Sequence, residues 1–205
     1  MAAQKKCDLK YGLPNSETTS RYLEYVRARV DEERWVHCVE TAKMAAELAA
    51  RNGESPARAA IAGLVHDVAR PMSDEELIAR SGTEDDISEV ERRFPKLLHG
   101  PVAAKMVRDE MKCTDEELLF AVRHHTCGHP QFATLGKCLM VADYIEPSRD
   151  FPEAAAVRAE LTLDIDRILL RVIESKINYL QDSGLDVAPR TVALRHILQQ
   201  RISRQ

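Results

Sequence analysis

The chain has 205 residues, 44% of them hydrophobic and 30% charged, and a formal net charge of −4. This size and balance predict one globular domain with a substantial core, and the acidic charge argues against a nucleic-acid binder. The five cysteines form no C-x-x-C motif, which predicts reduced thiols in the cytoplasm rather than disulfides or a thiolate zinc site. No stretch is long and apolar enough to predict a membrane span.

The first 19 residues are polar and lack the apolar segment of a secretory signal, so we predict a flexible extension over 1–19. After it, apolar residues recur at three- and four-residue steps between start and stop signals, which indicates amphipathic helices. The predicted helices span 20–51 with a break near Asp31, then 56–69, 74–80, 101–111, 115–125, 134–145, 153–181 and 189–202. The charged stretch 85–93 is predicted to be a solvated helix or loop. Strand alternation is missing, so we predict an all-α bundle of roughly eight to ten helices.

Local signals support several of these boundaries. Ser55-Pro56 is a typical helix start, because a capping residue precedes a proline at the first helical position. Ser73 with Glu76, and Thr114 with Glu117, have the spacing of a capping box, in which the two side chains satisfy free backbone N–H groups. These motifs predict where two further helices begin.

Polar side chains recur beside the apolar segments. The pair His66-Asp67 ends an apolar run in the last turn of the predicted helix 56–69, where burial costs several kcal/mol unless the pair is satisfied or binds a metal. Alone, this pair is equally typical of a satisfied polar pair at a helix end. The residues of this kind are, in chain order, His37, His66, Asp67, His99, His124, His125 and Asp143. Their convergence in one helical domain predicts a cation site, and imidazoles with carboxylates suit iron, manganese, zinc or cobalt.

The order of these residues resembles a known signature. His37, His66-Asp67 and Asp143 are similar to the H…HD…D pattern of the HD-domain metal-dependent phosphohydrolases. A finer resemblance, to the YqeK family, is carried by the blocks 62–69, 98–100, 125–128 and 142–149. The resemblance implies an HD-domain helical bundle.

The resemblance covers about residues 20–182, so we predict an HD domain there and a C-terminal helix over 183–205 that packs on it or extends from it. Two positions depart from the YqeK pattern. Arg70 stands where lysine is usual, and Cys127 replaces the second threonine of a Thr-Thr-Gly sequence. We expect these departures to affect phosphate contacts and not the metal site.

The resemblance implies symmetrical hydrolysis of diadenosine tetraphosphate to two ADP, with a bound divalent metal ion for which iron is expected and manganese or cobalt are open alternatives. It places the metal on His37, His66, Asp67 and Asp143. It places the nucleotide and its phosphates near His99, His125, Thr126 and Arg149, with His37, Asp67 and Asp143 also facing the substrate. The expected mechanism is attack of a metal-activated water on an inner phosphorus. Asp67 takes the water's proton, and His99 or His125 protonates the leaving oxygen.

Several alternatives stay open. Another HD enzyme, such as a nucleoside 5′-monophosphatase or an alarmone pyrophosphohydrolase, would use the same ligands with a different pocket. A non-catalytic nucleotide-sensing module is the alternative from another class. His99, His124 and His125 are compatible with a second metal, although helical spacing puts only His125 on the apolar face of its helix. The stripe over 153–181 is compatible with a homodimer or with packing inside the bundle, and no nucleic-acid or membrane partner is expected.

Overall fold

The computed structural model describes residues 12–14, 17–82 and 87–204. Within these ranges the chain forms eleven α-helices, one 3-10 helix and no strand, which confirms the predicted all-α class. The helices are α2 (Glu17–Arg27), α3 (Glu32–Arg51), α4 (Pro56–Val65), α5 (Asp74–Ser81), α6 (Glu89–Arg93), η1 (Pro95–Leu98), α7 (His99–Met111), α8 (Glu116–His124), α9 (Thr134–Ile145), α10 (Pro152–Ala159), α11 (Ile165–Asp182) and α12 (Pro189–Ile202). Among the described helices, none combines the length and apolarity needed to cross a bilayer.

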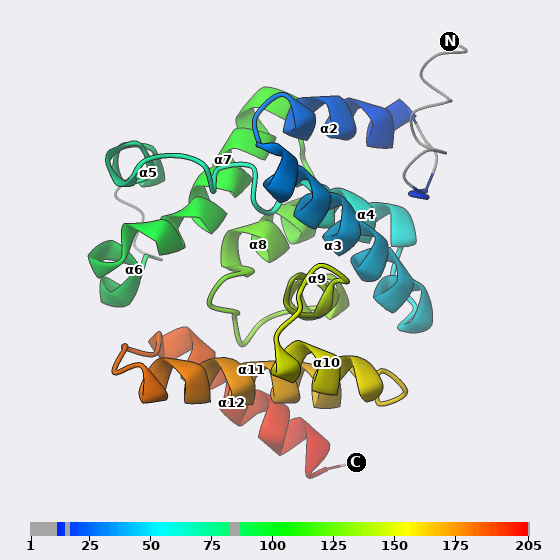
Figure 1. Ribbon diagram of the computed structural model, residues 1–205, viewed down its shortest axis with the longest axis vertical. Helices are drawn as coiled ribbons and strands as arrows, with labels where there is room; N and C mark the ends of the chain where they lie inside the picture. The colour runs from blue at the N-terminus through cyan, green and yellow to red at the C-terminus, as the bar shows by residue number, and fades with distance from the viewer. Residues whose placement is uncertain (1–11, 15–16, 83–86, 205) are drawn as a thin grey trace.

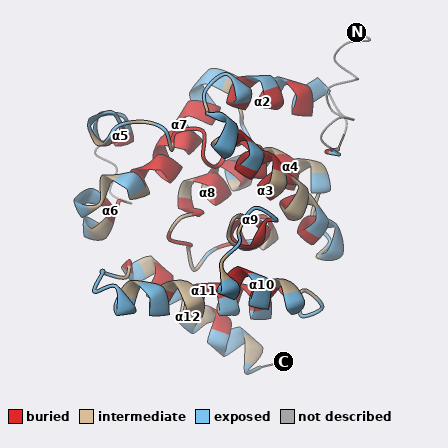
Figure 2. Ribbon diagram, viewed as in Figure 1, coloured by how far each residue is buried: buried red, intermediate tan, exposed pale blue. Residues whose placement is uncertain are grey.

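The helices pack around a centre made by α3, α4, α8 and α9 (Figure 1). Helix α7 lies on α8, while α10, α11 and α12 form a layer against the other side of α9. The short helices α5 and α6 lie to one side, next to η1. Figure 2 shows that buried residues line the sides of the central helices that face one another. The facing sides of these central helices therefore form the core of the molecule.

Small residues allow α3 and α4 to approach closely. A Cβ atom on Gly63 of α4 would lie 2.6 Å from the Cα atom of Ala42 in α3, so a larger residue would push the helices apart. Ala45 and Ala60 are also fully buried. This close contact of two backbones brings the start of α3 and the end of α4 together.

Helix α4 is shorter than the predicted helix 56–69. It ends at Val65, and the following residues form turns closed by the bonds from Val68 N to Val65 O (3.1 Å) and from Arg70 N to Asp67 O (2.9 Å). In a continuing helix the carbonyl oxygen of Gly63 would accept from Asp67 N, but here it accepts from the His66 Nδ1 atom at 2.7 Å, so the helical bonding stops early. As a result Asp67 lies in a turn and not on the last turn of a helix.

The predicted helix 153–181 is in fact two helices. Helix α10 ends at Ala159 and α11 begins at Ile165, because the Asp164 side chain caps the backbone N–H groups of Asp166 and Arg167. The apolar stripe of α11 packs against α9 and α12, so bundle packing accounts for it. This break, together with helix α6 in the stretch predicted as a helix or loop, explains why the described helices outnumber the expected eight to ten.

The two predicted capping boxes have different outcomes. Ser73 and Glu76 form the reciprocal box as predicted. The start of α8 is capped by Asp115 and not by Thr114, because the Asp115 carboxylate accepts from Leu118 N at 3.1 Å. In the charged stretch, Ser88 begins α6 with a further capping box.

The two ends of the chain are described to different extents. Residues 1–11 and 15–16 of the predicted N-terminal extension lie outside the described residues, while Leu13 is buried and α2 begins at Glu17. At the other end, α12 packs on α11. The domain boundaries at 20 and 182 stay predictions.

Candidate active site

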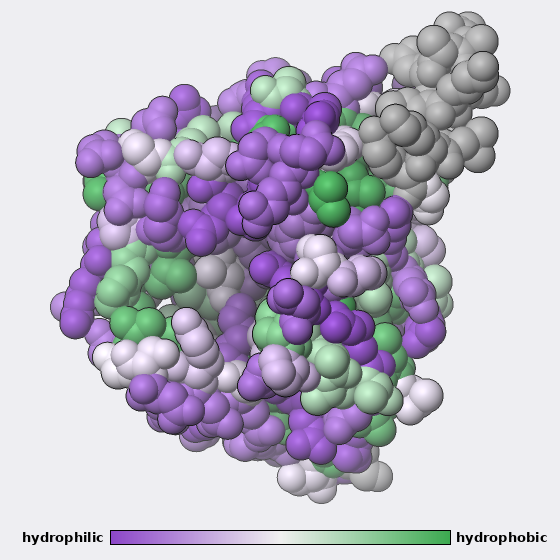
Figure 3. Space-filling view, in the orientation of Figure 1, coloured by the Kyte–Doolittle hydropathy of each residue, from purple (hydrophilic) through white to green (hydrophobic). Residues whose placement is uncertain are grey.

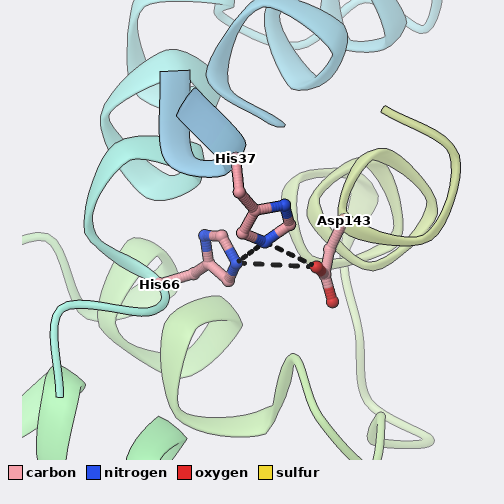
Figure 4. A group of neighbouring side chains, drawn as sticks. All are labelled: His37, His66 and Asp143. Carbon is pink, nitrogen blue, oxygen red and sulfur yellow. Dashed lines mark hydrogen bonds and ion pairs between the residues drawn. The ribbon is translucent and has the colours of Figure 1, made fainter. Parts of the chain in front are cut away.

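Four predicted metal ligands lie at one point in the bundle. Figure 4 shows His37 from α3, His66 from the end of α4 and Asp143 from α9 pointing at one another. The Nε2 atoms of His37 and His66 are 3.1 Å apart, and the Asp143 Oδ1 atom lies 3.2 Å and 3.6 Å from them. Asp67 adds its Oδ2 atom at 3.7 Å from each Nε2 atom. Atoms that share one ion at bond lengths of about 2.1 Å lie about 3.0–3.4 Å apart, so this spacing fits a metal.

The outer nitrogens fix which atoms face the centre. The His66 Nδ1 atom lies 2.7 Å from the carbonyl oxygen of Gly63, which can only accept, so Nδ1 carries the hydrogen and Nε2 offers a lone pair. The His37 Nδ1 atom lies 3.1 Å from the carboxylate of Glu146 in the same way. Two imidazole lone pairs and the Asp143 carboxylate thus converge in a buried place, where only a cation or a proton relieves their repulsion. This donor set is a ready ligand set for a transition metal.

The charges at this point perturb the ionisation of each group. Burial lowers the pKa of His37, but hydrogen bonds with the carboxylates of Asp143 and Glu146 outweigh burial and raise it to about 9. Burial raises the pKa of Asp67, but the charge of His66 and hydrogen bonds from two further histidines hold that pKa well below its usual range. Burial acts in the same direction on Asp143, and hydrogen bonds from His37 and His66 likewise keep its pKa low. Both aspartates are therefore ionised and available to a cation.

A second histidine pair lies on the other side of Asp67. The Nε2 atoms of His99 and His125 are 3.0 Å apart, and they lie 3.0 Å and 3.6 Å from the Asp67 Oδ1 atom. Their Nδ1 atoms donate to the carbonyl oxygens of Lys96 and Val122 respectively, each three residues earlier. The two carboxylate oxygens of Asp67 therefore face different histidines. Oδ2 faces His37 and His66, and Oδ1 faces His99 and His125. His99, which was expected before a helix starting at 101, is the first residue of α7.

The two adjacent histidines at the end of α8 face different surroundings. His125 lies with His66 and Asp67 in one group of possible metal ligands, and the Thr126 hydroxyl lies 3.4 Å from its Nε2 atom. The His124 ring instead packs against Phe120, with ring centroids 4.5 Å apart, and receives a hydrogen bond from Arg190 at 2.8 Å. This is the orientation that helical spacing predicted.

Two arginines lie at the edge of the cluster. The Arg149 Nη2 atom is 2.9 Å from the Asp143 Oδ1 atom and 3.5 Å from the His37 Nε2 atom. The Arg34 Nη1 atom donates to the Asp67 Oδ2 atom at 2.7 Å. Arg149 was expected near phosphates, and here it compensates the charge of a predicted metal ligand. Both guanidinium groups are partly exposed, so they remain accessible to an incoming anion.

Arg34 and Glu146 contact the cluster but were not singled out in the sequence. Glu146 is fully buried, and its other carboxylate oxygen accepts from the backbone N–H of Ser148 at 2.6 Å. Helical spacing held a signal for both residues. Arg34 precedes His37 by three residues, and Glu146 follows Asp143 by three, so each lies one turn from a predicted ligand.

A cavity of about 990 Å³ opens beside the cluster. Thr126 and Tyr144 line it, so it begins next to the second histidine pair. Its wall is largely apolar and aromatic, with Tyr144 and Phe151 in edge contact at a ring-centroid distance of 5.1 Å. Charged side chains of both signs also line it: Lys96, Lys176, Glu153, Asp182 and Asp186. Figure 3 shows the surface hollowed in this region, with hydrophobic side chains around the hollow. The volume and the largely apolar lining are typical of a pocket for an organic ligand.

Comparison with known proteins gives matches that cover the same residues. The family model described as the HD domain matches residues 34–148. This stretch contains the three residues labelled in Figure 4 and Asp67, together with both residues of the second histidine pair. Helices α10, α11 and α12 lie beyond the matched stretch.

Curated relatives match over most of their length. A protein of Bacillus subtilis named "Bis(5'-nucleosyl)-tetraphosphatase, symmetrical" is 35% identical over 82% of this chain and 91% of the relative. A protein of the same name from Halalkalibacterium halodurans is 31% identical over 83% of this chain and 91% of the relative. The crystal structure of a predicted HD superfamily hydrolase involved in NAD metabolism from Clostridium acetobutylicum has a TM-score of 0.82 at 30% identity. That match covers 90% of this chain and 97% of the other.

Proposed function

Because the chain belongs to the HD domain family of metal-dependent enzymes, we propose that it cleaves diadenosine tetraphosphate symmetrically to two ADP. One observation carries the proposal more than any other: four metal-type donors converge beside a cavity large enough for a nucleotide. The names of relatives that match over most of both chains support the same substrate. The activity is a hydrolysis of a phosphoric anhydride.

We assign the metal to His37, His66, Asp67 and Asp143, with iron as the ion and manganese or cobalt as alternatives. Mixed imidazole and carboxylate donors suit each of these ions, and the partly exposed Arg149 edge leaves access for substrate oxygens. When bound, the metal supplies a water of lowered pKa and draws electron density from the phosphoryl group. Glu146 holds the ring of His37 in the ligating orientation.

We assign the second histidine pair, His99 and His125, to proton transfer. Since both Nδ1 atoms of His99 and His125 donate to carbonyls, their Nε2 atoms face each other at 3.0 Å beside Asp67. We propose that one of these two Nε2 atoms delivers a proton to the oxygen of the leaving nucleoside diphosphate. A carboxylate with a low pKa is a better metal ligand than a proton acceptor, so we keep Asp67 as a metal ligand and not as the acceptor of the water's proton.

The cavity accommodates one half of the substrate. Its volume lies within the range of about 300–1,000 Å³ that is typical of ligand pockets, which is suitable for one nucleoside with its phosphates. The rings of Tyr144 and Phe151 offer apolar surface to the base. Thr126 and Lys176 line the cavity, and Arg149 lies at the edge of the metal-ligand cluster, so these donors and positive charges are available to stabilise phosphate oxygens.

Product analysis tests the proposal. The protein is loaded with ferrous iron, manganese or cobalt and given diadenosine tetraphosphate, and the products are separated by ion-exchange chromatography. We expect ADP alone, with loss of activity on chelation and recovery on adding metal back. ATP with AMP, or faster turnover of a nucleoside monophosphate or an alarmone, would contradict the proposal. Tight binding without hydrolysis would support a nucleotide sensor instead.

A further inference from the structure

We propose that α12 is a positioning element of the active site: its first residues hold the turn 124–128 and thereby aim His125 and Thr126. This inference rests on the proposed function for its catalytic consequence. The helix lies outside the stretch matched by the HD domain family model, and it was expected to pack on the HD domain or to extend from it. Its contacts are with the turn that carries His125, one member of the second histidine pair.

Arg190, at the start of α12, joins two segments of the site. One nitrogen of its guanidinium lies 2.8 Å from the His124 Nδ1 atom, and another lies 3.1 Å from the Glu91 Oε2 atom. Side chains of Arg190 and Glu91 are only 12% and 3% exposed, so this pair is shielded from solvent. Glu91 is in α6, which leads through η1 to His99, while His124 directly precedes His125. Arg190 therefore ties together the two segments that carry the histidine pair.

Thr191 holds the backbone of the turn itself. Its buried hydroxyl donates to the carbonyl oxygen of Cys127 at 2.6 Å. On the same turn, Gly128 has φ +72°, and a Cβ atom there would lie 2.6 Å from Leu194 of α12. From the neighbouring helix α11, Lys176 donates to the carbonyl oxygen of Thr126 at 3.0 Å. Three consecutive residues after His125 are thus held from one side by α11 and α12.

This arrangement matters because the turn is a short, irregular piece of backbone. A helix fixes its residues through its own hydrogen bonds, but residues 125–128 follow the last turn of α8. The bond from Gly128 N to His124 O closes the turn at 2.7 Å, and the contacts of α12 fix where that turn points. Side chains that transfer a proton need placement within a fraction of an ångström, so a positioning contact acts on kcat.

The test compares Thr191→Val, which keeps the shape but loses the hydroxyl, with Thr191→Ser, which keeps the hydroxyl. The matched control is Thr162→Val, at an exposed threonine in the loop before α11. We measure kcat and KM with diadenosine tetraphosphate, metal content per chain, thermal unfolding, and amide hydrogen exchange at Gly128. Arg190→Lys keeps the positive charge but loses the two guanidinium nitrogens that contact His124 and Glu91. It gives a second variant should Thr191→Val not fold.

For Thr191→Val we expect a fall in kcat of about tenfold, KM within about twofold, unchanged metal content and faster exchange at Gly128. Thr191→Ser should restore kcat to within about twofold, and Thr162→Val should match the wild type. Unchanged kcat, a rise in KM alone, or a failure of serine to rescue would overturn the inference. Should the wild type not cleave the tetraphosphate, the proposed function fails. Exchange at Gly128 then decides the positioning role, and unchanged exchange would overturn it.

Discussion

His37 and the pair His99 and His125 lie on opposite sides of Asp67 and differ in what holds their outer nitrogens. The Nδ1 atom of His37 meets the carboxylate of Glu146, whereas the Nδ1 atoms of the pair meet backbone carbonyls. A carboxylate adds negative charge, which favours a cation on the ring and contributes to the raised pKa of about 9 for His37. A carbonyl fixes the tautomer without adding a full charge. His66, also on the first side, has a carbonyl partner, so the contrast rests on His37 alone. We propose that the first side holds a cation and the second a mobile proton.

The carboxylate that joins the two sides should give the largest effect. Asp67→Ala removes one oxygen from each side, so we expect metal to be lost and hydrolysis to fall at least about a thousandfold, roughly 4 kcal/mol in transition-state stabilisation. Metal analysis and kinetics measure this, and circular dichroism should show the helical content unchanged. The control is Asp150→Ala, at an exposed aspartate. Full activity in metal-free Asp67→Ala protein would refute the assignment of a metal to this cluster.

Removing the negative charge of Glu146, the partner of His37, should weaken metal binding on the first side only. Glu146→Gln keeps an acceptor for the Nδ1 hydrogen but loses the negative charge, so metal affinity should fall about ten- to a hundredfold. Competition with a chelator measures that affinity. Glu153→Gln, at an exposed position on the cavity wall, is the matched control and should leave it unchanged. Equal affinities in both variants would show that the carboxylate and carbonyl partners are equivalent.

Arg149 lies on the first side but is expected to bind the phosphates of the substrate. With Arg149→Ala, losing a charge-assisted phosphate contact should cost about 2 kcal/mol, or about thirtyfold in KM. Metal affinity should not fall, because the guanidinium repels a cation near Asp143. Arg171→Ala, at an exposed surface pair with Glu160, is the control. A loss of metal with unchanged KM would assign Arg149 to the cluster's structure instead.

The smallest loss of activity is expected when a histidine of the second pair is replaced. His125→Ala should lower kcat/KM about tenfold, about 1.4 kcal/mol, with the metal content retained, because a proton donor and not a ligand is lost. His124→Ala should cost only about two- to threefold, since His124 contacts the site through Arg190. Loss of a second metal equivalent in His125→Ala protein would mean that the two sides both bind metal.

Some boundaries followed from local chemistry, and others did not. The capping box of Ser73 and Glu76 was predictable because its two partners are three residues apart. The start of α8 was not, because Thr114 and Asp115 are adjacent and can both cap a helix, and it is the Asp115 carboxylate that accepts from Leu118 N. The break before α11 depends on Asp164, whose capping role the long apolar stripe obscured. All of these caps are local bonds, so the predictions failed where two local signals competed.

The sequence by itself determined the helical class, the order of the histidines and aspartates, and the face on which His125 lies. These depend on periodicity and on bonds to residues three positions earlier, such as His125 Nδ1 to Val122 O. Only the tertiary structure decided that Glu146 is the partner of His37, 109 residues earlier, and that Arg190 reaches His124 from 66 residues later. The physical reason is that such contacts depend on how helices cross, which small residues such as Gly63 allow and no local pattern specifies.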